Sequence, residues 1–189
     1  MLGPDAQEVL TTRNNLASAI GEAGNPAGAR DAYAALLTDL ERLHGPDAPA
    51  VLTTRNNLAE WIGQAGDPAK ARDALAVLLP DRVRVLGHDA PGTLATRASL
   101  ARWSGEAGDP TRARDALASL LPDLVRVLGK TSPNTLRARA SLAWWTGKAG
   151  NAAGARDALA ALLTDRVRLL GPEHPDTLES RAWLDRLSR

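Results

Sequence analysis

Several residue types are scarce or missing in this chain of 189 residues. It has no cysteine and no phenylalanine, and its only aromatic residues are one tyrosine and five tryptophans. Without cysteine, the chain can form neither a disulfide nor a thiolate metal site. Its sequence contains no apolar run long enough to span a bilayer, and its first residues lack the apolar centre of a signal peptide. We therefore expect a cytoplasmic protein whose core is built from alanine and leucine, which favour helices.

The charges are nearly balanced over the whole chain but differ between its two halves. The net charge is +1, so the chain as a whole has no general attraction for nucleic acid. Residues 1–86 hold 11 acidic and 8 basic side chains, a net charge of −3, whereas residues 87–189 hold 11 acidic and 15 basic ones, a net charge of +4. A partner that binds along the chain would meet two different electrostatic environments.

A repeat of 42 residues organises the sequence. Residues 3–44 and 45–86 are identical at 28 of 42 positions, and residues 87–128 and 129–170 at 25. The same spacing separates a series of glycines, namely Gly3, Gly45, Gly87, Gly129 and Gly171. The chain therefore consists of four complete repeats (3–44, 45–86, 87–128 and 129–170) and a partial fifth (171–189).

Each repeat predicts two helices joined by a short turn. In the second repeat, helix A begins near Pro49 and ends before Gly66, and helix B begins at Pro68, with Asp67 as its N-cap. Helix B ends before Gly87, which we expect to take the left-handed conformation of a helix C-terminus. One helical hairpin cannot bury its own apolar faces, so neighbouring hairpins must stack as an all-α solenoid, with residues 171–189 as a C-terminal capping helix.

Two residue types recur inside the apolar stripe of helix A. Arginine occupies positions 13, 55, 97, 139 and 181, and tryptophan occupies positions 61, 103 and 145. Since a buried charge needs a partner, we expect each arginine to bind an aspartate of helix B, with Arg181 using Asp165. A ligand-binding role for these arginines stays open as the alternative. The tryptophans are expected to pack between repeats.

The sequence contains no recognisable catalytic or metal site. His44, His88 and His174 fall at separate turns, and the carboxylates are spread by the repeat. The segment TGKAG at 146–150 lacks the spacing of a phosphate-binding loop. We therefore expect no enzyme activity, no metal and no cofactor. Pro80 and Pro122 lie within helix B and are expected on its outer surface.

The repeats resemble tetratricopeptide repeats, specifically the 42-residue kind of kinesin light chains. The resemblance rests on GPDAPAVLTTRNNLAEWIGQAGDPAKARDAL (45–75) and LGPEHPDTLESRAWL (170–184), and it extends over essentially the whole chain. It implies a right-handed α-solenoid, a tetratricopeptide superhelix. The arginine-rich style is also similar to arrays in actinomycete-type bacteria, where such repeats accompany nucleotide-binding domains of STAND and NB-ARC regulators.

This resemblance implies that helices A line a concave peptide-binding groove. In the first two repeats the polar positions carry asparagines, whose amides can donate to and accept from a peptide backbone. In the later repeats basic residues and tryptophans, including Arg186, suit an acidic segment with an apolar or aromatic anchor. The candidate groove residues are Asn14, Asn15, Asn56, Asn57, Glu60, Ser99, Arg102, Arg137, Ser141, Trp144, Lys148 and Trp183.

The sequence leads to one main functional hypothesis and two alternatives. The main hypothesis is a non-catalytic scaffold that binds peptides or proteins and serves as the sensor array of a larger bacterial regulator. The first alternative is self-association through the exposed N-terminal repeat, which has no polar capping helix. The weaker second alternative is nucleic-acid binding by the basic half, whose arginines are interleaved with acids.

Overall fold

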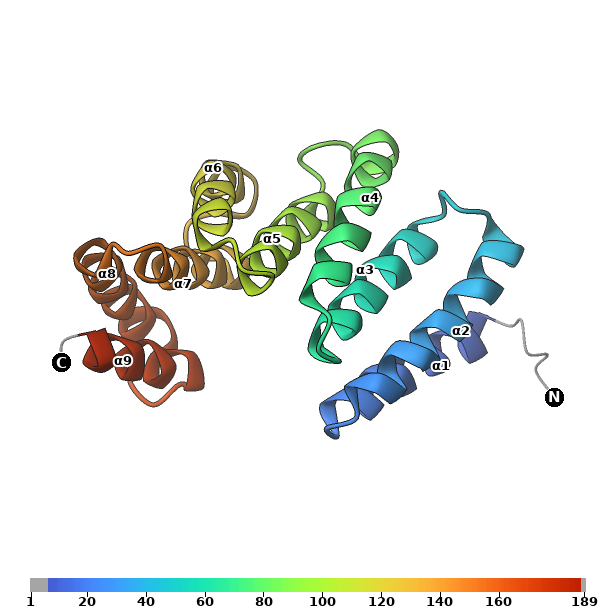
Figure 1. Cartoon of the computed structure of the whole chain (residues 1–189), viewed down its shortest axis with the longest axis horizontal. Helices are drawn as coiled ribbons and strands as arrows, with labels where there is room; N and C mark the ends of the chain where they lie inside the picture. The colour runs from blue at the N-terminus through green and yellow to red at the C-terminus, as the bar shows by residue number, and fades with distance from the viewer. Residues whose placement is uncertain (1–6, 188–189) are drawn as a thin grey trace. The chain divides into compact units, whose positions relative to one another are not determined.

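A computed structural model of the chain describes residues 7–187, with the side chain of Leu187 excepted. This part of the chain is entirely helical and without strands, which confirms the all-α class (Figure 1). Its helices follow the predicted alternation of helix A and helix B. They are α1 (Gln7–Glu22), α2 (Pro26–His44), α3 (Pro49–Gln64), α4 (Pro68–Leu86), α5 (Pro91–Glu106), α6 (Pro110–Leu128), α7 (Pro133–Lys148), α8 (Ala152–Leu170) and α9 (Pro175–Leu187).

The helices belong to two compact units, the first ending at Trp103 and the second beginning at Ser104. In the first unit α1 packs on α2, α2 on α3, and α3 on α4. In the second unit α6 packs on α7, α7 on α8, and α8 on α9. Each unit is therefore a series of helical hairpins in which every helix B also contacts the next helix A, as in a helical-repeat solenoid.

The start of each helix B uses the predicted cap. The carboxylate of Asp67 accepts a hydrogen bond from the backbone N–H of Lys70 at 3.0 Å, and Pro68 occupies the first turn. The side chains of Asn25, Asp109 and Asn151 accept the equivalent bond, and proline follows the first two but not Asn151. These side chains satisfy a backbone donor that the helix itself leaves free.

The glycines at the helix ends differ from the prediction. Gly87, which follows helix B, has φ 90° and ψ 163°, a positive φ with an extended ψ, and so the expectation of a left-handed helical conformation there was wrong. The pattern of a left-handed cap lies instead at the end of helix A. There Gly66 has φ 102° and donates to the Gly63 carbonyl, while Asp67 N–H donates to the Ile62 carbonyl. These two bonds together are the Schellman motif.

Leucine and alanine side chains fill the interior of each hairpin. In the second repeat, Leu52 and Ala59 of α3 pack against Ala71, Leu75 and Leu78 of α4, and all five are buried. Pro80 and Pro122 are exposed, as predicted, and α4 and α6 continue through them.

The recurrent tryptophans pack between repeats, as the sequence predicts. The ring of Trp61 lies over Gly21 of the preceding helix A, and Trp103 lies over Gly63 in the same way. In the second unit, a β-carbon at Gly105 would lie 2.6 Å from Cη2 of Trp145, closer than atoms can approach. Each glycine therefore leaves the space that one indole ring fills, and Trp103 and Trp145 are each only 5% exposed.

The recurrent arginines form the predicted ladder within repeats. Nη1 of Arg13 lies 2.7 Å from Oδ2 of Asp39, and Arg55 binds Asp81 at 2.8 Å. Arg139 binds Asp165 at 2.7 Å in the second unit. These half-buried pairs join helix A to helix B of the same repeat, 26 residues further along the chain. Each of these three guanidinium groups already has a carboxylate partner. A structural role within the repeat is therefore favoured over a role in ligand binding.

The last predicted rung is absent. Arg181 on α9 is exposed, and Asp165 instead accepts from Arg139 and Arg168. The physical reason is that Asp165 already binds the arginine of its own repeat, and Arg181 belongs to a partial repeat without a helix B.

Two further arginines are buried, and sequence reasoning missed both. Arg82 is 4% exposed and Arg166 is 2% exposed, although the equivalent positions of the other repeats hold Leu40 and Leu124. Nη2 of Arg82 donates to the Leu52 carbonyl at 2.9 Å. Burial lowers the pKa of both guanidinium groups. The signal was present in the sequence, because a charged residue alternates with leucine at a position of the helix-B stripe.

The tryptophan–glycine contact predicts a coupling between two mutations. Trp103→Ala should lower the free energy of unfolding by about 3–5 kcal/mol because it leaves a cavity. Gly63→Ala should cost about 1–3 kcal/mol alone by overpacking, and much less when Trp103 is already alanine. Urea unfolding of the two single variants and the double variant measures the coupling, with Val77→Ala at an exposed position as the control. Simple additivity of the two changes would contradict the contact.

The ladder predicts a stability difference that depends on pH. The Arg55 guanidinium, with Arg84, holds the pKa of Asp81 below its usual value of 3.8. A lowered folded-state pKa contributes stability above the unfolded pKa, and that contribution is lost as pH falls through the folded value. Arg55→Met should therefore unfold at lower urea than the parent at pH 7, and this difference should shrink below about pH 4.

The control for this experiment is Arg72→Met, which removes an arginine that pairs with its exposed neighbour Asp73. Arg72→Met should change the stability to urea only slightly, and this small difference from the parent should not depend on pH in the same way. An Arg55→Met penalty that stayed constant from pH 7 to pH 2 would show that packing of the aliphatic stem, not the ion pair, stabilises this contact.

Candidate functional site

Two candidate asparagines, Asn14 of the first repeat and Asn57 of the second, contact a buried tyrosine. Tyr33 of α2 is fully buried, and its hydroxyl lies 2.6 Å from Ser18 Oγ and 3.2 Å from the Asn14 carbonyl, to which it donates. The Asn57 amide donates to the same hydroxyl at 3.5 Å. Asn14 and Asn57 are half-buried, whereas Asn15 is exposed. Tyr33 thus orients part of this polar surface, a role that sequence reasoning missed because it considered helix A alone.

Two candidate residues of the second repeat, Asn56 and Glu60, are bonded to the next helix A. Thr96 of α5 donates to the Asn56 side chain at 2.9 Å, and Arg102 of α5 forms an ion pair with Glu60 of α3. The Arg102 guanidinium also lies 4.3 Å from the ring centroid of Trp103. The side chain of Asn56 therefore already has a partner on the next helix A. Glu60 offsets the charge of Arg102, so this region is less basic than the sequence suggests.

The other polar candidates differ in their exposure. Ser99 on α5 and Ser141 on α7 are half-buried, and Arg137 on α7 is exposed. Of these three, Arg137 can present its charge to an approaching partner.

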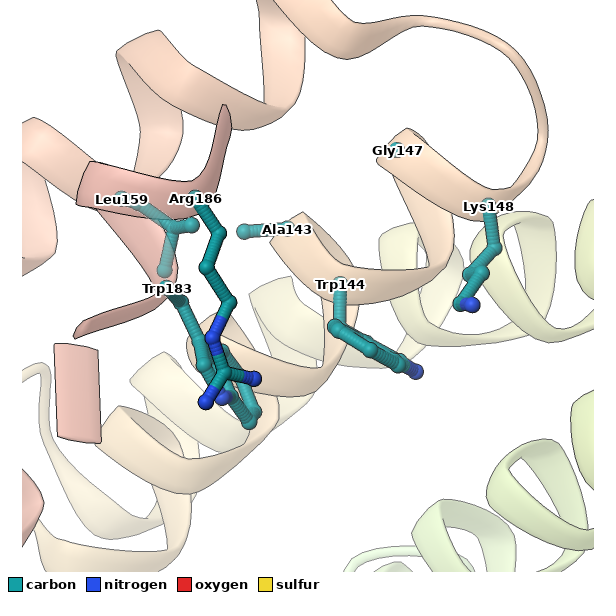
Figure 2. Close-up of a pocket in the computed structure, with 7 residues that line it drawn as sticks. All are labelled: Ala143, Trp144, Gly147, Lys148, Leu159, Trp183 and Arg186. Carbon is teal, nitrogen blue, oxygen red and sulfur yellow. The ribbon is translucent and has the colours of Figure 1, made fainter. Parts of the chain in front are cut away.

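A pocket in the second unit brings together three of the candidate residues. Figure 2 shows Trp144 and Lys148 on α7 and Trp183 and Arg186 on α9, with Trp183 and Arg186 extending in the same direction. The pocket has a volume of about 210 Å³. Its remaining lining residues are Ala143, Gly147 and Leu159.

The pocket combines aromatic surface with positive charge. The ring centroids of Trp144 and Trp183 are 5.1 Å apart at an interplanar angle of 35°, and Lys148 Nζ lies 4.7 Å from the Trp144 ring. Trp144 also contacts Trp145 edge to face, with centroids 6.5 Å apart. Indole faces favour apolar and aromatic groups, while Lys148 and Arg186 favour an anion beside them. The pocket can therefore hold an aromatic or apolar group flanked by carboxylates.

A second hollow lies in the first unit among α1, α2 and α3. It has a volume of about 330 Å³, with leucines on its walls and threonine, asparagine and glutamine as its polar residues. Only Asn14 of the candidate set contributes. The lining residues are Gln7, Leu10, Thr11, Asn14, Leu36, Leu40, Pro49, Ala50, Thr53 and Thr54.

The titratable residues are arranged by the repeat. The three histidines are exposed, and His174 Nδ1 accepts from the N–H of Asp176 at the start of α9. Within residues 7–187 no group of three histidine, aspartate or glutamate side chains is placed to hold a metal ion. None of the helices in that range is both long and apolar enough to cross a membrane.

Family models for the tetratricopeptide repeat match residues 8–80 and residues 135–176 of the chain. Together the two matches span more than half of the sequence. No curated protein matches it.

Solved structures show the same fold at low sequence identity. One is a protein from Podosopora anserina, described as a kinesin light chain with nearly identical TPR-like repeats; it shares 20% identity in a form with one substitution and 21% in the form without it. The TM-scores are 0.79 and 0.78, and both alignments cover 99% of this chain and 87% of the other. BtubC (BKLC) from P. vanneervenii has a TM-score of 0.79 at 17% identity, over 95% of this chain and 72% of its own.

The repeat length, the paired helices and both family models agree. The chain belongs to the tetratricopeptide repeat family, with a fold similar to that of kinesin-light-chain-like repeat proteins.

Proposed function

We propose that this chain is a non-catalytic scaffold that binds an acidic protein segment carrying an aromatic or apolar anchor. Tetratricopeptide repeats are in general scaffolds for protein interaction. The observation that carries the finer proposal is the pocket of Trp144, Lys148, Trp183 and Arg186, where aromatic surface and two cations line one cavity.

Internal comparison supports an aromatic anchor in this pocket. Gly21, Gly63 and Gly105 each accommodate the indole ring of a following repeat. Gly147 is the next glycine of the same series, and it lines the pocket. The residue 42 positions after Trp145 is Leu187, so at Gly147 the series does not continue with an indole ring of the chain's own.

We also propose that the four repeats form one array closed by α9. Asp185 of α9 is exposed and stands where the preceding helices A carry a buried alanine. An aspartate there disfavours the close packing of another helix B, which suits a polar cap. The buried alanines are Ala17, Ala59, Ala101 and Ala143. In a larger bacterial regulator, such an array would be the sensor that recognises a partner.

Binding of synthetic peptides tests the pocket. An acidic peptide with a central tryptophan should bind, and replacing Lys148 and Arg186 together by alanine should weaken it about tenfold or more through lost charge complementarity. The affinity of the parent should fall with added salt. Fluorescence anisotropy of a labelled peptide measures both effects.

The matched control removes two exposed arginines elsewhere, Arg126 and Arg168. This variant has the same net charge as the Lys148/Arg186 variant but should retain most of the affinity. Equal losses in both variants would mean that net charge, not the pocket, recognises the peptide. Affinity that ignored both salt and the Lys148/Arg186 change would refute the proposal.

Self-association is a second candidate, favoured by one observation on α1. Leu16 is 58% exposed, whereas the equivalent Leu58 and Leu100 are half-buried against neighbouring repeats. If this face pairs with a second copy, sedimentation should show a fraction of dimer that rises with protein concentration. The Leu16→Glu variant should remain a monomer. A monomer at every concentration would exclude this candidate.

A further inference from the structure

Two successive interfaces between repeats in the first unit have side chains of different polarity at one buried position of helix B. The α2 residue at this position is Leu40, and the equivalent residue of α4, 42 residues later, is Arg82. Both side chains are buried, Leu40 at 4% and Arg82 at 4% exposure. The surrounding positions of the two interfaces are related by the 42-residue repeat, so the contacts of Arg82 can be compared with the space around Leu40.

Arg82 fills its interface with a guanidinium group. Its Nη2 donates to the Leu52 carbonyl at 2.9 Å, and its Nη1 lies so close to Gly92 that a β-carbon there would collide with it. No ion pair of Arg82 with a carboxylate is found among residues 7–186, and desolvation is the cause of its lowered pKa. At this place in the fold a guanidinium attached to its own helix is buried with the Leu52 carbonyl as an acceptor, while its Nε has no acceptor within residues 7–187.

The equivalent space beside Leu40 is the 330 Å³ hollow of the first unit. Its walls include Leu10, which corresponds to Leu52, and Ala50, which corresponds to Gly92. Leucine is shorter than arginine, so the side chain at position 40 leaves space that Arg82 fills one repeat later, except where the methyl group of Ala50 stands in the place of Gly92. Thr11, Asn14 and Thr53 are among its polar lining residues.

The electrostatic setting favours a cation in this hollow. None of its ten lining residues is charged. The first two repeats carry a net charge of −3, and Glu8 lies beside the lining residue Gln7 on α1. A positive group would be attracted to this unit over several ångströms, whereas an acidic group would be repelled.

We propose that this hollow binds the arginine side chain of a partner protein segment. The aliphatic stem packs on Leu36 and Leu40, and the guanidinium donates to the second lone pair of the Leu10 carbonyl, as Arg82 does at Leu52. The ligand's side chain enters from solvent and not from position 40, so its guanidinium does not have to overlap the methyl group of Ala50. This inference rests on the proposed function as a peptide scaffold, to which it adds a basic anchor.

Reciprocal exchange of the two interfaces tests the inference. The probe is acetyl-Ala-Arg-Ala-amide, followed by NMR shifts of the leucine methyl and threonine signals. The parent should show one site. Leu40→Arg with Ala50→Gly should show none, because the chain's own guanidinium then fills the hollow. Arg82→Leu with Gly92→Ala should open a second, equivalent hollow and show two sites.

The same peptide with citrulline in place of arginine serves as the probe control, since it keeps the shape and loses the charge; its shifts should be several-fold smaller. Circular dichroism of both double variants verifies that they fold. If the Arg82→Leu variant does not fold, the parent and the Leu40→Arg variant still give the one-site and no-site outcomes. Equal binding of arginine and citrulline peptides, or an unchanged site in Leu40→Arg/Ala50→Gly, overturns the inference.

The acidic tryptophan peptide is measured on the same variants to separate the two proposals. It should bind the Leu40→Arg/Ala50→Gly variant as it binds the parent, because its pocket lies at Trp144 and Trp183. If the parent binds the acidic peptide but not the arginine probe, only this inference is overturned. If the parent binds the arginine probe but not the acidic peptide, only the proposed pocket at Trp144 and Trp183 is overturned.

Discussion

The contact of an indole ring with a glycine of the preceding repeat is the constraint on which the stacking of this protein depends. A glycine in mid-helix costs about 1 kcal/mol relative to alanine, so its recurrence at Gly21, Gly63 and Gly105 needs a reason. The reason is space: a β-carbon at any of them would collide with the ring of Trp61, Trp103 or Trp145. The glycine of each helix A therefore limits how closely the next helix A packs on it and which side of the helix faces that neighbour.

Arginine has three physical roles in this fold, and only the surroundings distinguish them. Arg55 is half-buried beside Asp81 and joins two helices of one repeat. Arg82 is buried between repeats and bonds to a backbone carbonyl. Arg186 lines an open pocket beside Trp183. The same side chain is thus a structural ion pair, a space-filling core residue and a candidate ligand contact.

The candidate groove is not one uniform surface. Its middle part is bonded internally through Asn56–Thr96 and Glu60–Arg102, which leaves less polar capacity for a ligand. Among the described residues, the hollow beside Leu40 and the pocket of Trp144 and Trp183 both have space for a ligand. The first lies in the acidic part of the chain and the second in the basic part, so each suits a ligand group of opposite charge.

The sequence by itself determined the repeat, the helix pairs, the caps at residues such as Asp67, and the arginine ladder, because these follow from spacing and from contacts inside one repeat. It also placed Trp144, Lys148 and Trp183 among the candidates. Only the tertiary structure decided that Arg102 is paired, that Arg82 is buried and that Arg181 has no rung at Asp165. These outcomes depend on which side chains of different repeats meet, and a period of 42 residues does not contain that information. The glycine caps needed backbone angles for the same reason: glycine permits several positive-φ conformations, and the neighbouring helices select one.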